Sequence, residues 1–392
     1  MSRSFCISLS AALLLAVTPI EAAAQPKTVF SSGNIQVQSS DRQVLTDDGR
    51  IEVTSYQLLR DSINFGECYA DPKLKSLPTT YYTAQGPLGV VMKKCNVKSG
   101  AAEPAIAVIG MNAGTVAVYA RARQRFDFYE PSKVIVDLNE RKGKDSYFPS
   151  IVDARQRGAE LRIFHGSPRE QLKKHGQKKS YKIIVLEACS GENGEKLFLE
   201  FFTKEGIAEC LEHLTDDGVL CVHTSHRFLD LPIALAAMAK SLDLDVRRGH
   251  DSPPRDAART AAEMAHFSSE WVMLARAKGV LDGICVTPKG YKLDPTRAEK
   301  EYWTTPLPCD QVWTDKGPNS VKGVLHSHPF GMRYQAAVKP YAEVVKSLAT
   351  YVGQGDYIER HFWTMTRLPS VVDQWLVAQH LKNDRPLSQL WP

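Results

Sequence analysis

The stretch "VIGMNAGTVAVYA" (residues 108–120) predicts a strand, a glycine-containing turn and then a helix. In an open α/β sheet such a turn lies at the crevice outside the carboxyl end of the strand, where ligands bind. Gly110 and Gly114 let the backbone approach a ligand because glycine carries no Cβ. Asn112 stands between them, and Asn is the residue other than glycine that best tolerates a left-handed conformation. These three positions are therefore candidate cofactor-binding residues.

The next apolar run, "FDFYE", ends in an acid, Glu130, which lies 20 residues beyond Gly110. An acid at this spacing can accept hydrogen bonds from the two hydroxyls of a ribose. The pattern thus indicates a bound nucleoside. A tight turn followed by a solvated glutamate remains the alternative.

Short apolar runs alternate with helix-like segments through the middle of the chain. The runs are "AIAVIG", "FDFYE", "LRIFHG", "KIIVLEA" and "GVLCVHTS", and the helix-like segments include "TVAVYARARQ", "PSKVIVDLN" and "FFTKEGIAECLEHL". A further helix is expected in "LPIALAAMAKSLDL" and a further strand in "SSEWVMLAR". This alternation predicts a parallel α/β sheet with crossover connections, a doubly wound architecture.

The segments on either side of this region have different sequence patterns. Residues 34–95 alternate apolar and polar positions between turn signals such as "TDDGR", which predicts a small antiparallel sheet of short strands and hairpins. Beyond about residue 280 the pattern loosens, and amphipathic helices are expected at 336–349 and 370–383. We expect an N-terminal β domain over 25–95, an α/β domain over 96–318 and a mainly helical extension over 319–392.

Bulk composition is that of an ordinary soluble protein. Among 392 residues, 43% are hydrophobic and 24% charged. The net charge of +5 is spread along the chain, and the densest basic run, at 172–182, has almost no interleaved aromatics. We read that run as a solvated loop and expect no nucleic-acid partner.

The N-terminus predicts export. Arg3 precedes an apolar run of about a dozen residues, and Ala22 and Ala24 fit a small-x-small cleavage rule. We read residues 1–24 as a cleaved signal peptide, which would place the protein in the periplasm or outside the cell. A frayed helix or a misplaced start are the alternatives.

Seven cysteines remain after residue 24, with no CxxC spacing, so neither a zinc site nor a dense disulfide framework is indicated. Cys68–Cys95 or Cys285–Cys309 could pair in an oxidising compartment, and at least one thiol should stay free.

Two acids follow the strand "KIIVL", namely Glu187 and Glu192. They could deprotonate an amine, hold a cation or have no chemical role. Cys189 lies between them, but no positioned histidine partner is identifiable, so packing is favoured over a nucleophilic role.

Histidines recur at close spacing in "VHTSHRF" (His223, His226) and "LHSHPF" (His326, His328). Alternating histidines on a strand could chelate a metal. No cysteine or acid cluster accompanies either pair, so we read them as polar residues at strand ends and expect no metal.

An ordered series of motifs resembles the spermidine synthase-like family, in particular its bacterial branch. The series comprises "PTTYYTAQGPLG" (78–89), "VIGMNAGT", "YEP", "YFPSIVDA" (147–154), "LRIFHGS", "IIVLEACSGE", "GVLCVHTSHRFLDL" (218–231), "SSEWVMLAR" (268–276) and "VWTD" (312–315). The resemblance runs from about residue 36 to 318. It implies a Rossmann-like, class I methyltransferase-type domain behind a small N-terminal β domain.

The resemblance also implies a reaction. Enzymes of the family move an aminopropyl group from decarboxylated S-adenosylmethionine to putrescine, which needs an unprotonated, aligned amine and a base. The family's strand-end loop, approximately D-A-F-S-S-D, reads here E-A-C-S-G-E. Glu192 falls on the position of the catalytic base and Glu187 on that of the strand-end acid.

Further site residues are implied in the same way. Gly166 and Ser167 stand where the family has Gly-Asp at the adenine amino group. Tyr81 and Tyr82 match a pair at the amine entrance. Thr115 is implied as a further cofactor contact. Cys68 stands at the position of a substrate-contacting Gln, so Cys68 and its neighbour Glu67 are implied as substrate contacts.

Three functions stay open on this evidence. The first is an aminopropyltransferase using decarboxylated S-adenosylmethionine and a polyamine or other small amine, without a metal. Members of the family commonly dimerise, so the resemblance also implies a homodimer. The second is a methyltransferase using S-adenosylmethionine itself. The third is an exported, non-catalytic binder of nucleosides or polyamines, since fold does not dictate function.

Overall fold

The computed structural model describes residues 26–46, 49–60, 63–97, 103–143, 146–187, 200–225, 230–251, 260–291 and 301–317. The expected signal peptide, the loop with Cys189 and Glu192, His226, and the C-terminal extension with His326 and His328 lie outside these residues.

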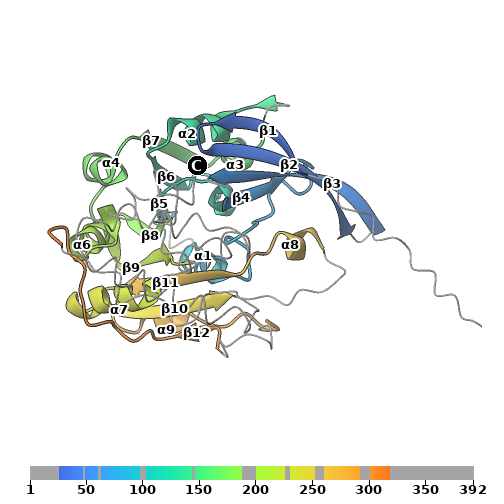
Figure 1. Ribbon diagram of the computed structural model, residues 1–392. Coiled ribbons are helices and arrows are strands. Elements are labelled where there is room, and N and C mark those ends of the chain that lie inside the picture. The colour runs from blue at the N-terminus through green and yellow to red at the C-terminus, as the bar shows by residue number, and fades with distance from the viewer. Residues whose placement is uncertain are drawn as a thin grey trace, which may run out of the picture.

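The N-terminal part is a four-stranded antiparallel sheet in the order β1-β2-β3-β4. The strands are β1 (Lys27–Ser32), β2 (Ile35–Thr46), β3 (Gly49–Arg60) and β4 (Ile63–Tyr69). The prediction of hairpins is confirmed, although β2 and β3, at 12 residues each, are longer than expected. Figure 1 shows this sheet lying beside the larger α/β unit.

The main sheet has eight strands in the order β12-β10-β11-β9-β8-β5-β6-β7. They are β5 (Ala105–Ile109), β6 (Arg125–Glu130), β7 (Glu160–His165), β8 (Tyr181–Leu186), β9 (Leu214–His223), β10 (Asp245–Asp251), β11 (Ser269–Ala275) and β12 (Trp303–Thr304). Strands β5 to β9 pair in parallel, whereas β11 runs antiparallel to both neighbours, β9 and β10. This mostly parallel, doubly wound sheet is the class I methyltransferase-like fold that the sequence predicted.

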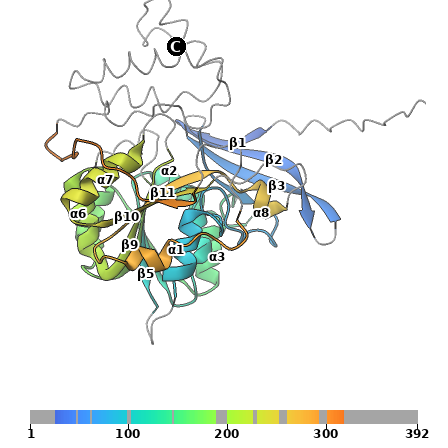
Figure 2. The same cartoon turned by 90° about the horizontal axis from the view of Figure 1, so that it is seen from below.

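Helices cover both faces of the main sheet (Figure 2). They are α1 (Pro87–Cys95), the 3₁₀ helix η1 (Thr115–Tyr119), α2 (Lys133–Glu140), α3 (Ser150–Gln156), α4 (Pro168–His175), α6 (Lys204–His213), α7 (Leu231–Ser241), α8 (Ala261–Met264) and α9 (Val280–Ile284). The core layer on one face includes residues of α4, α6 and α7, and the layer on the other includes α1, η1, α2, α3 and α9.

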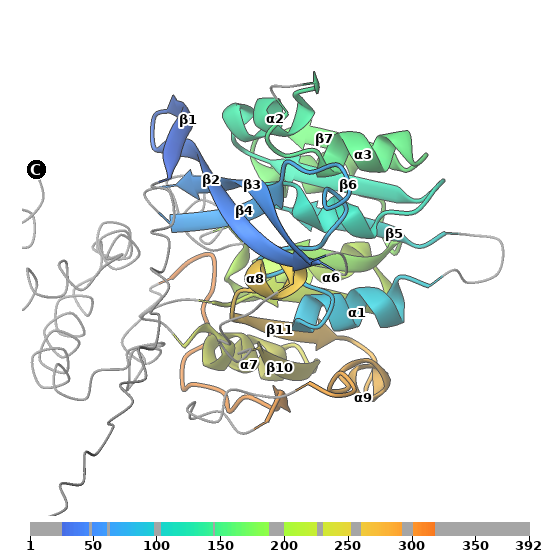
Figure 3. The same cartoon turned by 90° about the vertical axis from the view of Figure 1, so that its right-hand side faces the viewer.

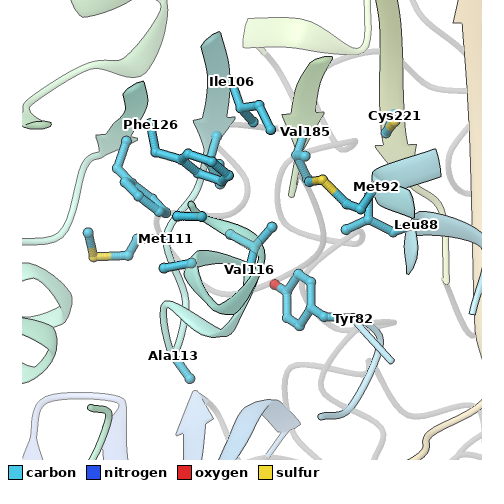
Figure 4. Packing of buried hydrophobic residues seen from close by; sticks show 14 of the residues in the cluster. Tyr82, Leu88, Met92, Ile106, Met111, Ala113, Val116, Phe126, Val185 and Cys221 are labelled. Atoms are coloured by element: carbon cyan, nitrogen blue, oxygen red, sulfur yellow. The ribbon is translucent and has the colours of Figure 1, made fainter. Parts of the chain in front are cut away.

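Strand alternation explains the two layers. In β5, Ala107 and Ile109 face one layer while Ile106 and Val108 face the other. Figure 4 shows Ile106 of β5 with neighbours from adjacent strands and Met92 of α1 in the second layer. Both faces of the sheet are therefore apolar, as continuous runs such as "KIIVL" indicated.

Two segments differ from the prediction. The expected helix "TVAVYARARQ" is only the single 3₁₀ turn η1, because the guanidinium of Arg157 bonds the carbonyl oxygens of Ala117 and Ala120 and the chain is extended at Ala120. Residues 87–95, expected in the β domain, form α1, which packs on β10, β11 and α9 of the α/β unit. Proline at its first position favours this start.

The N-terminal sheet contacts the turn that follows β5. A Cβ placed on Gly66 of β4 would lie 2.4 Å from the Cβ of Ala113, so glycine alone allows this approach. The Tyr69 hydroxyl also donates to the carbonyl of Ala261 over 2.9 Å. Figure 3 shows β4 and β2 alongside the β5 and β6 end of the main sheet. The sheet therefore shields the candidate cofactor turn.

Neither cysteine pair considered above is bonded, since Cys68, Cys95, Cys285 and Cys309 are all free thiols. Within the described ranges, no helix combines the length and the apolar character needed to cross a bilayer.

Candidate functional site

The site lies at the carboxyl ends of the parallel strands, where the strand order reverses around β5. Strand β6, which follows β5 in sequence, pairs on one side of it, while β8 pairs on the other. Such a switch point opens a crevice at the sheet edge. Gly110, Glu130, Glu187 and His223 all stand at or just beyond the carboxyl ends of neighbouring strands.

The turn after β5 has the backbone that the sequence suggested. Gly110, Asn112 and Gly114 have φ values of 88°, 51° and 66°. The Asn139 side chain donates to the carbonyl of Asn112 over 2.8 Å and fixes this conformation. A Cβ on Gly114 would lie 2.3 Å from Asn139 Oδ1, so this glycine is required by packing within the protein.

Glu130 is the last residue of β6, with 2% of its surface exposed. Its Oε2 accepts the backbone N–H of Met111 over 2.6 Å, and its Oε1 accepts that of Ser132 over 2.8 Å. Burial raises the pKa of this carboxyl, although the charge of Arg60 and the two backbone bonds oppose the shift. An ionised carboxylate has about four lone-pair sites, so acceptor capacity remains on both oxygens.

Glu187, just beyond β8, is 4% exposed and pairs with a histidine. Its Oε2 lies 2.9 Å from His223 Nδ1, and His223 Nε2 lies 2.9 Å from Ser225 Oγ. Ser225 Oγ in turn accepts the backbone N–H of Glu270 over 2.8 Å. The second oxygen of Glu187, Oε1, is buried as well, and the Tyr82 hydroxyl lies near this carboxylate.

Aromatic rings enclose this cluster. The His223 ring stacks on Trp271 at 4.5 Å and 19°, and the Tyr81 ring lies 4.7 Å away on a tilted plane. Tyr82 is 1% exposed, and Asn112 Nδ2 lies 3.5 Å from its hydroxyl. Burial, and next the charge of the nearby Glu187, raise the pKa of this phenol well above its usual value.

Cys68 and Glu67, the two residues of β4 that the resemblance implies as substrate contacts, lie on opposite faces of that strand. The Cys68 thiol lies 3.8 Å from both the Thr115 and Ser150 hydroxyls, and burial raises its pKa to about 11. Glu67 is fully buried on the other face, where it pairs with Arg42 at 2.9 Å. Cys68 and Thr115 thus contact each other in the core, and their ligand contacts stay predictions.

At the end of β7, Gly166 donates its N–H to the Glu130 carbonyl over 3.3 Å. Ser167 begins α4 as its N-cap, and its hydroxyl donates to Glu200 Oε1 over 3.2 Å. Glu200 also accepts the backbone N–H of Arg169. A carboxylate from another element therefore occupies the neighbourhood of Ser167.

The sequence placed Glu130 and Glu187 at strand ends, and the resemblance implied the two tyrosines. Ser225 was not predicted, and His223 was read as a polar residue at a strand end. Glu192 lies outside the described residues, and its role stays a prediction. No group of three or more histidine, cysteine or acidic residues suited to a metal occurs in the part of the chain that the structure describes.

Comparison with known proteins gives only distant likenesses. No family model and no curated protein matches the sequence. The spermidine synthase of Thermotoga maritima is 12% identical over 69% of this chain and 80% of its own, with a TM-score of 0.40.

Two further solved structures are similar over about half of the chain. The precorrin-8w decarboxylase of Methanobacterium thermoautotrophicum is 15% identical over 48% of this chain and 88% of its own, with a TM-score of 0.31. A SAM-dependent methyltransferase of Thiobacillus denitrificans, in complex with S-adenosyl-L-homocysteine, is 9% identical over 46% and 58%, with a TM-score of 0.25. These likenesses are too weak to assign a function, and the fold class follows from the strand order described above.

Proposed function

We propose that the protein binds a nucleoside sulfonium compound at the carboxyl end of β5 and β6 and transfers an alkyl group from it to an amine. The observation that carries this proposal is the position of Glu130. Its buried carboxylate is tied to the turn after β5 through Met111 and keeps lone pairs for two ribose hydroxyls.

The donor that we favour is decarboxylated S-adenosylmethionine and the acceptor a di- or polyamine, as the resemblance implies. The amine nitrogen attacks the carbon beside the sulfonium, the C–S bond breaks, and its electron pair stays on sulfur as methylthioadenosine. The nitrogen then loses a proton to a carboxylate. The resemblance assigns that base to Glu192.

Glu187 supports the amine side of this proposal. Its carboxylate is buried at the switch point, where the Tyr82 hydroxyl approaches it, and a buried negative charge of this kind is suited to a cationic amine. The tyrosine pair lies against the same acid, since Tyr81 packs on His223 and Tyr82 lies beside Glu187.

Calorimetric titration tests the proposal. The purified protein is titrated with decarboxylated S-adenosylmethionine, S-adenosylmethionine and methylthioadenosine, each with and without putrescine. We expect micromolar binding of the decarboxylated compound, tightened by the amine, followed by aminopropyl transfer in a product assay. Preference for S-adenosylmethionine would instead favour methyl transfer, and no binding of any of the three would overturn the proposal.

A matched pair of variants locates the nucleoside. Glu130→Gln should weaken binding about 10- to 100-fold, because hydrogen bonds to a charged group contribute about 1.5–3 kcal/mol. Glu140→Gln, at the exposed end of α2, should bind as the unmodified protein does.

A further inference from the structure

Ser225, His223 and Glu187 have the connectivity of a nucleophile, a base and an orienting acid. Both links are 2.9 Å long, from Ser225 Oγ to His223 Nε2 and from His223 Nδ1 to Glu187 Oε2. A hydroxyl within hydrogen-bond reach of an imidazole that a third group orients is the diagnostic arrangement of an activated nucleophile. The same roles recur on unrelated folds and are recognised by geometry.

The hydrogen bonds fix the tautomer that this chemistry needs. A carboxylate can only accept, so with Glu187 ionised the proton of the neutral imidazole lies on Nδ1. Nε2 is then an acceptor that faces the Ser225 hydroxyl. The serine oxygen is also oriented from its other side by the backbone N–H of Glu270.

The surroundings favour the charged imidazole that forms when the serine loses its proton. His223 is 3% exposed, stacked on Trp271 at 4.5 Å and flanked by Tyr81 at 4.7 Å. A cation against aromatic faces is stabilised by about 0.5–2 kcal/mol, most where water is excluded. Glu187 adds the opposite charge on the Nδ1 side.

Hydrogen-bonded neighbours fix the position of Ser225, but the residue stays partly exposed. Glu270, whose N–H contacts it, is itself fixed by Arg248 at 2.8 Å and by Thr224 at 3.2 Å. Ser225 is half-buried, whereas His223 and Glu187 are buried. Ser225 is thus the partly exposed member of the cluster, as a nucleophile requires.

We propose that Glu187, His223 and Ser225 form an acyl-transfer site whose substrate is a carboxylic ester. This activity is distinct from the alkyl transfer proposed above and needs no sulfonium compound. Ser225 Oγ forms a bond to the acyl carbon while its proton passes to His223 Nε2. The C–O bond to the alcohol breaks as the alcohol takes that proton, and water then hydrolyses the acyl-serine to a carboxylic acid.

A fluorophosphonate reagent tests the nucleophile directly, because its phosphorus captures an activated serine oxygen with loss of fluoride. The full chain is treated at pH 7.5, digested and mapped by mass spectrometry, and hydrolysis of p-nitrophenyl acetate is followed in parallel. We expect one adduct, on Ser225, and an ester hydrolysis that the adduct abolishes. An unlabelled Ser225 in folded protein would overturn the proposal and leave the cluster as a structural contact between strands.

Two variants distinguish a Ser225 that His223 activates from a serine that reacts only because it is exposed. His223→Gln should slow labelling of Ser225 at least about 100-fold, since a positioned base contributes about 10²- to 10⁴-fold. Ser180→Ala removes another half-buried serine, hydrogen-bonded to Gln177 at 2.8 Å, and should change nothing. Equal labelling rates with and without the imidazole would refute the role of His223 as the general base.

If His223→Gln does not fold, Ser225→Ala decides instead. This variant should lose both the adduct and the ester hydrolysis. Hydrolysis that survives Ser225→Ala would overturn the proposal. Binding of nucleoside sulfonium compounds is measured on the same samples, so the two proposals can fail separately.

Discussion

Replacing Glu130 by glutamine should raise the relative stability of the protein between pH 4 and pH 7 while weakening its nucleoside binding. The carboxylate is buried at the crevice and accepts the N–H groups of Met111 and Ser132. Burial outweighs these bonds and the charge of Arg60, so the pKa of the folded carboxyl lies above its ordinary value. The neutral form is therefore the one that the fold prefers.

The sign of the pH dependence follows from this raised pKa. A glutamate in the unfolded chain has a pKa of about 4.3. Below that pH the carboxyl is neutral in both states, and its contribution to the free energy of unfolding is fully present. As pH rises through the folded pKa the contribution is lost, because the unfolded chain releases its proton first. Every tenfold difference in proton affinity between the two states is worth about 1.4 kcal/mol.

Glutamine resembles the protonated acid in shape and charge. They differ in one respect: the hydroxyl oxygen of the acid keeps acceptor capacity, whereas the NH2 group of glutamine cannot accept, so the variant loses one of the two backbone hydrogen bonds at every pH. Because the raised pKa acts only on the acid, the stability of Glu130→Gln relative to the unmodified protein should increase between pH 4 and pH 7, by about the 0.5–2 kcal/mol that is common when a residue retained for function is replaced. This relative gain is the pH-dependent part of the difference. It should vanish near pH 4.

Urea unfolding of both proteins between pH 4 and pH 8 measures this difference, with Glu140→Gln as the exposed control. A variant that is less stable at pH 7, with a deficit that does not change with pH, would refute the reasoning. It would show that the two backbone hydrogen bonds outweigh the cost of burying the charge.

Three further outcomes are expected. Gly66→Val should destabilise the protein by about 1–3 kcal/mol in urea unfolding, because its Cβ would meet Ala113 at 2.4 Å, whereas Gly283→Ala has open space and should be near neutral. Asp127→Ala should cost about 1–3 kcal/mol in the same assay, since it leaves the buried Tyr181 hydroxyl without its acceptor, whereas the partly exposed guanidinium groups of Arg125 and Arg162 can be solvated. The Cys68 thiol, with its pKa raised to about 11, should resist iodoacetamide at pH 8 in the folded protein and react only on unfolding, as mass spectrometry would show.

The fold was largely predictable because its strands are short apolar runs bounded by turns. Burial on both faces leaves little choice for "AIAVI" or "KIIVL" other than an interior parallel strand. The helix expected after Gly114 failed for a non-local reason. Arg157, more than 30 residues away, bonds the carbonyl groups that a longer helix would have used, and no local pattern announces this.

The acids of the site were predictable because each ends a strand, and parallel strands bring their carboxyl ends to one edge. His223 could have been found by the same logic. Leu186 pairs with Val222 in the parallel register, so the next residues, Glu187 and His223, must be neighbours. Ser225 needed the side-chain geometry, because it lies beyond the end of β9, where no strand register fixes the position of its hydroxyl relative to the imidazole.

Both proposed activities use Glu187, but each uses a different oxygen of its carboxylate. Substitutions can therefore separate the two activities. Alkyl transfer uses the charge at Oε1, whereas acyl transfer uses Oε2 to hold the imidazole. Glu187→Gln keeps an acceptor for His223 but removes the charge, so both amine affinity and the rate of serine labelling should fall. His223→Gln leaves the carboxylate in place, so it should slow labelling while the protein still binds the amine. If instead both variants lose amine binding to the same degree, the histidine positions the acid for the amine, and the hydrogen bond from Glu187 to His223 belongs to the alkyl-transfer site.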